Sequence, residues 1–106
     1  MSGRGQSRWS MTVAGTNGGA TATYAAGAAG SRHAVGGIQC SGDAAALVTV
    51  ESPAATVLYR KRFAAAFNMS ETFDPPLVGA FASALVVKVS ASTSNSESNA
   101  QGITEV

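Results

Sequence analysis

Turn-forming residues divide this sequence into short, strand-like segments at nearly regular intervals. The segments are rich in Val, Ala, Thr and aromatic residues, and the separators are rich in Gly, Asn, Asp, Ser and Pro, which favour tight turns. Strands at this spacing, with short connections and no crossover helices, predict an all-β fold. We expect an antiparallel β-sandwich of about eight strands, jelly-roll-like, with a single closed sheet as the alternative. The predicted strands are residues 8–14, 20–25, 32–40, 44–52, 55–63, 67–73, 80–91 and 97–106.

Two places in this pattern are locally unusual. The segment KRFAAAF at residues 61–67 could form a helix, but it falls short of the about 12 residues at which an isolated helix becomes stable. It also lies between strand-like segments, so we expect strands there. Gly36 and Gly37 interrupt the segment 32–40, and we expect a bulge or a close approach of another backbone at that point.

Alternation within the predicted strands assigns side chains to the two faces of a sheet. In residues 55–63, Arg60 and Arg62 lie on the face opposite the aromatic residues, so we expect the two arginines to face solvent or a partner. In residues 80–91, one face carries larger apolar side chains that are predicted to lie together in the core: Phe81, Leu85, Val87 and Val89.

The chain has 106 residues, which predicts one domain. We divide it into residues 1–19, an N-terminal arm with the first strand, and residues 20–106, the β-sandwich. Hydrophobic residues make up 45% of the chain, but alanine supplies much of this share and aromatic residues only 7%. We therefore expect a thin core that gains stability from contacts with partner subunits.

Charged residues make up only 12% of the chain, and the formal net charge is +1. Because nucleic-acid-binding proteins typically carry a strongly basic surface, we expect no nucleic-acid partner. The beginning of the sequence has no apolar run typical of a signal peptide, and aliphatic stretches such as LVV at residues 85–87 are far shorter than the about 20 residues of a membrane-spanning helix. We therefore expect no membrane partner and synthesis in the cytoplasm.

Residues that could carry chemistry are few and dispersed. His33 follows Arg32, whose positive charge disfavours a further proton, so we interpret this histidine as a surface or interface residue. Cys40 is interpreted as a small core residue, and a single cysteine excludes an intrachain disulfide. No serine lies in a G-x-S-x-G turn, and the carboxylates fit turns or exposed strand positions. The prediction is a non-enzymatic protein with no catalytic residues, no cofactor and no metal site.

Two basic groups remain as candidate partner-binding residues. The N-terminal segment carries Arg4 and Arg8 without any acidic residue and ends at Trp9, which we expect to be buried against a neighbouring subunit. The alternative is that this segment packs on its own domain. The second group is Arg60 and Arg62, which are expected to meet acidic side chains of a partner.

Three segments resemble those of small virion proteins encoded with the head genes of tailed bacteriophages. The segments are FDPPLVG at residues 73–79, AFASALVVKVSA at residues 80–91 and NAQGITE at residues 99–105. The resemblance extends over about residues 20–106 and includes the Gly-, Ser-, Thr- and Ala-rich composition. It implies a jelly-roll-like β-sandwich that serves as a capsid decoration or cement protein, often a homotrimer, bound to the major capsid protein on the outer surface of the head.

Other functions remain open at this point. A tail, neck or fibre component is the alternative, such as a receptor-binding or carbohydrate-binding β-sandwich module. Such a module would need aromatic platforms, for which the sequence offers Trp9, Tyr24 and Tyr59. A hydrolase built on a β-sandwich has little support in the sequence.

Overall fold

The computed structural model describes residues 7–90 and 95–105, and these residues form eight strands and no helix. Most strand ends coincide with the predicted turn residues to within a few positions. The strands are β1 (Ser7–Gly15), β2 (Ala20–Tyr24), β3 (Arg32–Gly42), β4 (Ala46–Glu51), β5 (Val57–Phe63), β6 (Phe67–Val78), β7 (Leu85–Ser90) and β8 (Ser96–Glu105).

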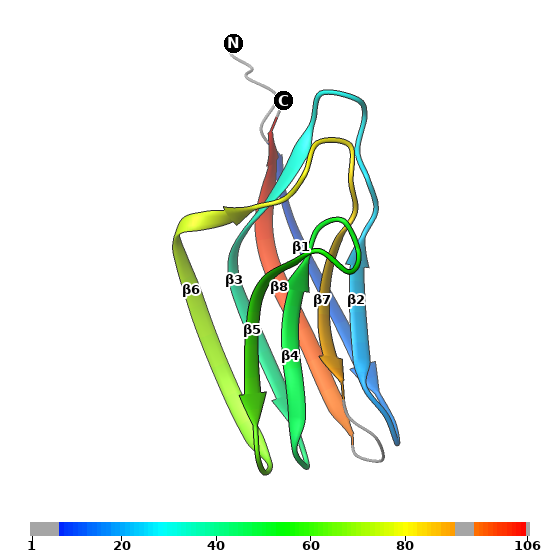
Figure 1. The fold of residues 1–106 in the computed structure, drawn as a ribbon, viewed down its shortest axis with the longest axis vertical. Coiled ribbons are helices and arrows are strands. Elements are labelled where there is room, and N and C mark those ends of the chain that lie inside the picture. Colours follow the sequence, from blue (N-terminus) through cyan, green and yellow to red (C-terminus); the bar gives the residue numbers. More distant parts are fainter. Residues whose placement is uncertain (1–6, 91–94, 106) are drawn as a thin grey trace.

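The strands form two antiparallel sheets of four, packed face to face as a β-sandwich (Figure 1). The strand order is β1-β8-β3-β6 in the first sheet and β2-β7-β4-β5 in the second. Successive strands therefore cross between the sheets except at the β4–β5 hairpin, which is the connectivity of a jelly roll with its two Greek keys. The predicted all-β, jelly-roll sandwich is confirmed.

The two locally unusual segments behave as strand features. Residues 61–67 are not helical: β5 ends at Phe63, β6 begins at Phe67, and the three alanines between them form the turn. The rings of Phe63 and Phe67 stack across this turn with their centroids 4.2 Å apart. The predicted bulge is also confirmed, because the register of β3 against both β6 and β8 shifts between Val35 and Gly37.

The inner faces of the two sheets form the core. Of the four residues of segment 80–91 that were predicted to lie there, three are buried. Leu85, Val87 and Val89 are all 0% exposed. Phe81 is instead 59% exposed, so its assignment to the core is wrong. The alternation fails there because β7 begins only at Leu85, and the residues before it form a turn in which Ala82 has a φ of 52°.

The connections between strands gather at the two ends of the sandwich. The β2–β3 and β6–β7 connections lie at the upper end in Figure 1, where the chain also leaves β8, and the β4–β5 connection points the same way but lies lower, nearer the middle of the sandwich. The β1–β2, β3–β4 and β5–β6 connections lie at the opposite, lower end. The upper connections matter most for the candidate site.

Candidate functional site: an uncharged loop end

The upper end of the sandwich is built from three loops that contain no charged side chain. They are residues 25–31, 52–56 and 79–84, which consist of Ala, Gly, Ser, Pro, Thr and one Phe. Among the described residues, the large hydrophobic side chains that are exposed all lie in or beside these loops: Val57 (45%), Val78 (41%) and Phe81 (59%). We refer to residues 25–31, 52–57 and 78–84 as the loop end.

Hydrogen bonds join the three loops into one surface, with the β6–β7 loop in the middle. On one side, the Gly79 amide donates to the His33 carbonyl at 2.8 Å and the Ala82 amide donates to the Ser31 carbonyl at 2.7 Å. On the other side, the Ser52 hydroxyl donates to the Ala84 carbonyl at 2.8 Å. The β6–β7 loop is therefore anchored to both of its neighbours.

Phe81 is held in its exposed position by contacts with its own domain. The guanidinium of Arg32 lies over the Phe81 ring, 5.0 Å from its centroid. Arg32 is in turn fixed by an ion pair with Glu105, whose Oε1 lies 3.0 Å from Nη2. The Arg32 contact therefore favours one position of the Phe81 ring while most of the residue stays exposed.

His33 lies beneath this surface and is 2% exposed, so its assignment to the surface or an interface is wrong. The Ala25 carbonyl, 2.7 Å from Nε2, can only accept, so Nε2 donates a hydrogen bond to it. In the neutral imidazole, Nδ1 then accepts a hydrogen bond from the Thr104 hydroxyl at 2.7 Å. The ring also packs edge-on against Tyr24, with centroids 4.7 Å apart. The imidazole thus ties the β2–β3 loop to β3 and β8, and it does not face solvent.

Trp9 is part of this aromatic cluster. Its ring stacks on Tyr24 with centroids 4.6 Å apart, and the residue is 7% exposed within its own domain. Trp9 is therefore buried by residues of its own domain, and little of its side chain is left to contact a neighbouring subunit. Arg8 is exposed at the start of β1, and Arg4 lies outside the described residues. A partner contact by either arginine stays a prediction.

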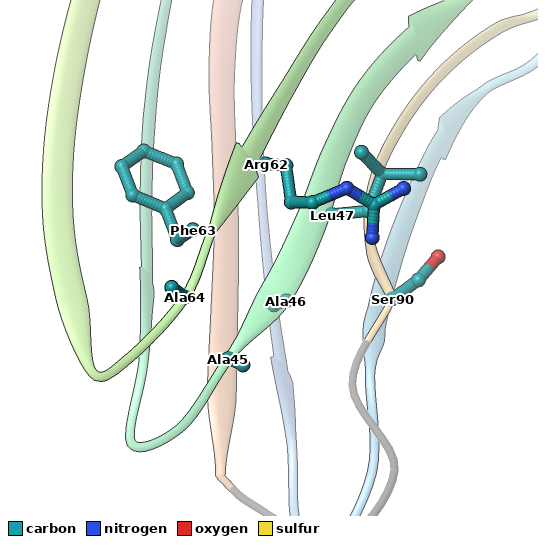
Figure 2. A pocket seen from close by; sticks show the side chains of 7 residues that line it. All are labelled: Ala45, Ala46, Leu47, Arg62, Phe63, Ala64 and Ser90. Carbon is teal, nitrogen blue, oxygen red and sulfur yellow. The ribbon is translucent and has the colours of Figure 1, made fainter.

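Arg60 and Arg62 are exposed on β5, as expected from the alternation, at the opposite edge of the sandwich from β1. The structure therefore does not bring the two predicted basic groups together. Arg62 extends over Leu47 toward β7 and borders an open depression of about 560 Å³ (Figure 2). The other lining residues include Ser90, Phe63 and three alanines. The Arg62 guanidinium and the Ser90 hydroxyl, beside apolar side chains, can bind an acidic side chain, but they do not form an acid–base pair for catalysis.

The remaining chemically active side chains have structural surroundings. Cys40 is a buried core residue, as predicted, and burial raises the pKa of its thiol above the ordinary value of 9.0. Within residues 7–90 and 95–105, no group of three or more His, Cys, Asp or Glu side chains could hold a metal ion. The same part of the chain contains no helix that is long and apolar enough to cross a membrane.

Comparison with known proteins leaves the chain without a family assignment. No protein-family model matches the sequence, and a search of curated proteins finds no significant match.

The prediction from sequence missed the loop end, although a signal for it is present. The runs AAGAAGS at residues 25–31 and GAFASA at residues 79–84 contain no charged residue and are rich in Ala and Gly, although residues 80–84 lie within a predicted strand. Since both runs lack charged residues, an uncharged surface at this end of the sandwich could have been predicted.

Proposed function

We propose that this chain is a structural virion protein that decorates the head of a tailed bacteriophage and attaches to the capsid through its loop end. The observation that carries this proposal is the exposure of Val57, Val78 and Phe81 in or beside loops that contain no charged residue. The cation next to Phe81 is Arg32, which is paired with Glu105. Exposed large hydrophobic residues that cluster at one place are typical of protein-binding sites, and aromatic side chains often dominate the binding energy. The exposed Phe81 ring is the side chain that we propose fills a pocket in the capsid protein.

The fold and the sequence pattern support a location on the capsid. Jelly rolls of this strand order occur in viral capsid domains, although the same fold also serves lectins and other proteins, so the fold alone is an analogy. The resemblance of residues 73–91 and 99–105 to head-gene proteins favours the capsid among these possibilities. The proposal includes a homo-oligomer, a trimer by the same resemblance, on the outer surface of the head.

A carbohydrate-binding module has less support from the geometry. Such a site needs aromatic faces that are open to a sugar ring, whereas Trp9 is buried and both Tyr24 and Tyr59 are half-buried. Tyr24 stacks on Trp9, and Tyr59 packs against Phe73 with ring centroids 5.1 Å apart. Because these three rings pack within the sandwich, we propose a protein and not a carbohydrate as the partner. The proposed subunit is non-enzymatic.

The test compares two variants for incorporation into virus particles. Particles purified from a culture that produces this chain should contain it at a fixed ratio to the major capsid protein. Phe81→Asp, supplied in place of the natural chain, should be lost from the particles because a charge would be buried in the contact. The matched control is Ala65→Asp, which adds the same charge at an exposed position in the β5–β6 turn at the opposite end. Particles without the chain, or equal incorporation of both variants, would contradict the proposal.

A further inference from the structure

The side of the sandwich formed by β1 and β2 is almost free of charge. From Trp9 to Ser31 the sequence contains no Asp, Glu, Lys or Arg. β1 is the outermost strand of one sheet and β2 is the outermost strand of the other, and the two strands contact each other along this side (Figure 1). We refer to β1 and β2, from Trp9 to Tyr24, as the neutral edge.

The opposite side of the sandwich has the features that discourage pairing between sheet edges. β5 carries three consecutive cations, Arg60, Lys61 and Arg62. β6 leaves regular pairing with β3 between Thr72 and Leu77, and this stretch contains Asp74 and two prolines. Charged side chains, prolines and bulges at an edge strand all prevent a further strand or sheet from joining it.

The neutral edge lacks these features. β1 pairs with β8 without a register shift from Ser7 to Gly15, and β2 pairs with β7 in the same regular way. Neither strand contains a proline, and the one charge is Arg8, near the beginning of β1. A regular, uncharged edge strand presents free backbone N–H and C=O groups to a partner.

The inner side chains of β1 are only partly covered. Met11 and Val13 are half-buried, whereas Ala100 and Ser98, which face them on β8, are 0% exposed. The difference arises because β1 has a neighbouring strand on one flank only. A protein that packed along the neutral edge would complete the burial of these two side chains.

We infer that copies of this chain associate with one another through the neutral edge. Two such edges can meet without like-charge repulsion, and neither leaves a charge buried without a partner. The nine residues of β1 span about 30 Å, and two sheets stacked about 10 Å apart make this edge a long, narrow contact surface for a second copy. The edge is also continuous with the loop end through residues 25–31, so contacts between copies would lie beside the capsid contact.

This inference rests on the proposed function for its biological purpose, but it can be tested without a capsid. Contact between copies is a property of the purified chain, whereas attachment through Phe81 requires particles. A chain that associates but fails to decorate particles would contradict the proposed function alone. A chain that decorates particles as isolated monomers would contradict the inference, and with it the homo-oligomer of the proposed function, but not attachment through the loop end.

Analytical ultracentrifugation of the purified chain provides the test, with lysine substitutions as probes. We expect the natural chain to sediment as a homo-oligomer at micromolar concentrations. Thr12→Lys on β1 and Thr23→Lys on β2 should each raise the apparent dissociation constant at least about tenfold, because both residues are exposed on the neutral edge. The matched control is Ser70→Lys, which is exposed on β6 in the same cross-strand row as Thr12 and should leave association unchanged.

Several results would overturn the inference. The natural chain could remain monomeric up to about 1 mM, which would mean that the dissociation constant of any contact between copies lies well above that concentration. Ser70→Lys could weaken association as much as Thr12→Lys, or neither edge variant could have an effect. A monomeric chain whose Thr12→Lys variant fails to join particles would assign the neutral edge to a capsid protein instead. If a variant unfolds, hydrogen exchange of the natural chain provides the test instead. As the concentration of the natural chain rises, the amides of β1 and β2 should gain protection and those of β6 should not. Unchanged protection of β1 and β2 would refute the inference.

Discussion

The carboxylate of Glu51 accepts a hydrogen bond from the backbone amide of Ala55 at 2.9 Å, and this contact ties the β4–β5 loop to the end of β4. The same carboxylate accepts a hydrogen bond from the Thr49 hydroxyl at 3.1 Å and lies 3.5 Å from the Lys88 ammonium. Glu51 is only 5% exposed, and Ala55 has a φ of 75°, a left-handed conformation that costs an alanine roughly 1 kcal/mol. The buried carboxylate therefore stabilises a strained turn at the loop end.

Glu51→Ala is expected to destabilise the protein by about 1–3 kcal/mol, because the Ala55 amide loses its acceptor and Lys88 loses its partner. Chemical denaturation measures the change in the free energy of unfolding. Glu97→Ala is the control, since Glu97 is an exposed carboxylate on β8 and should change stability little. Equal stability of the two variants would show that the Ala55 contact contributes nothing.

The stability of the natural chain should also depend on the ionisation of Glu51. The hydrogen bond from the Ala55 amide is the main cause that holds the pKa of Glu51 below its ordinary value of 4.5, against the opposing effect of burial. Because the pKa is lower in the folded state, the contribution is complete above about pH 4.5 and is lost as the pH falls through the lowered pKa. Unfolding measured from pH 6 to pH 3 should lose less stability in Glu51→Gln than in the natural chain. A parallel loss in both proteins would contradict this assignment.

Gly102 on β8 lies beneath the Trp9 ring and should not tolerate a side chain. A Cβ at this position would come within 2.6 Å of Trp9 Cζ2 and would also overlap the Ala34 carbonyl oxygen. Overpacking of this kind costs about 1–3 kcal/mol or more, so Gly102→Ala should lower the melting temperature clearly. Gly18→Ala is the matched control, because no atom lies within 4 Å of a Cβ placed there. Unchanged melting of Gly102→Ala would contradict the close approach of both Trp9 and the Ala34 backbone to this glycine.

His33→Ala should destabilise the fold even though no catalytic role is proposed for this residue. The substitution removes a fully buried ring and leaves the Ala25 carbonyl without its hydrogen-bond donor, which together should cost about 2–4 kcal/mol. Thermal unfolding followed by circular dichroism measures the loss. Arg8→Ala, an exposed side chain on β1, is the control and should melt close to the natural chain. A stable His33→Ala protein would contradict the buried position.

The fold was predictable from the sequence because its determinants are local. Most strands end at residues with strong turn preferences, such as Asn17 with a φ of 58° in the β1–β2 turn, although three alanines form the β5–β6 turn. Alternation then assigns the faces of regular strands correctly. Leu85, Val87 and Val89 follow this rule. The two arginines of β5 do so as well, on the opposite face from Tyr59.

The predictions that were wrong concern residues whose surroundings depend on contacts between segments far apart in the sequence. Alternation was extended through Phe81, but the Ala82 amide pairs with Ser31 of another loop and not with a neighbouring strand. His33 was judged by its neighbour Arg32, whereas its environment is set by Tyr24 and Thr104. Trp9 was expected against another subunit because no local pattern reveals the ring of Tyr24 beside it.

Val87 provides the most direct test of the core assignment. Its side chain is 0% exposed on the inner face of β7, where its ladder neighbours are Ala22 on β2 and Val50 on β4, both also 0% exposed. Val87→Asp would place an unpaired charge in this apolar interior at a cost of several kcal/mol, and it should prevent folding. Val57→Asp is the matched control, since Val57 is 45% exposed at the loop end and the same substitution there should leave the fold intact. Far-ultraviolet circular dichroism should therefore show a β spectrum for Val57→Asp and an unfolded spectrum for Val87→Asp. Two folded variants would mean that the inner face of β7 has been assigned to the wrong side of the sheet.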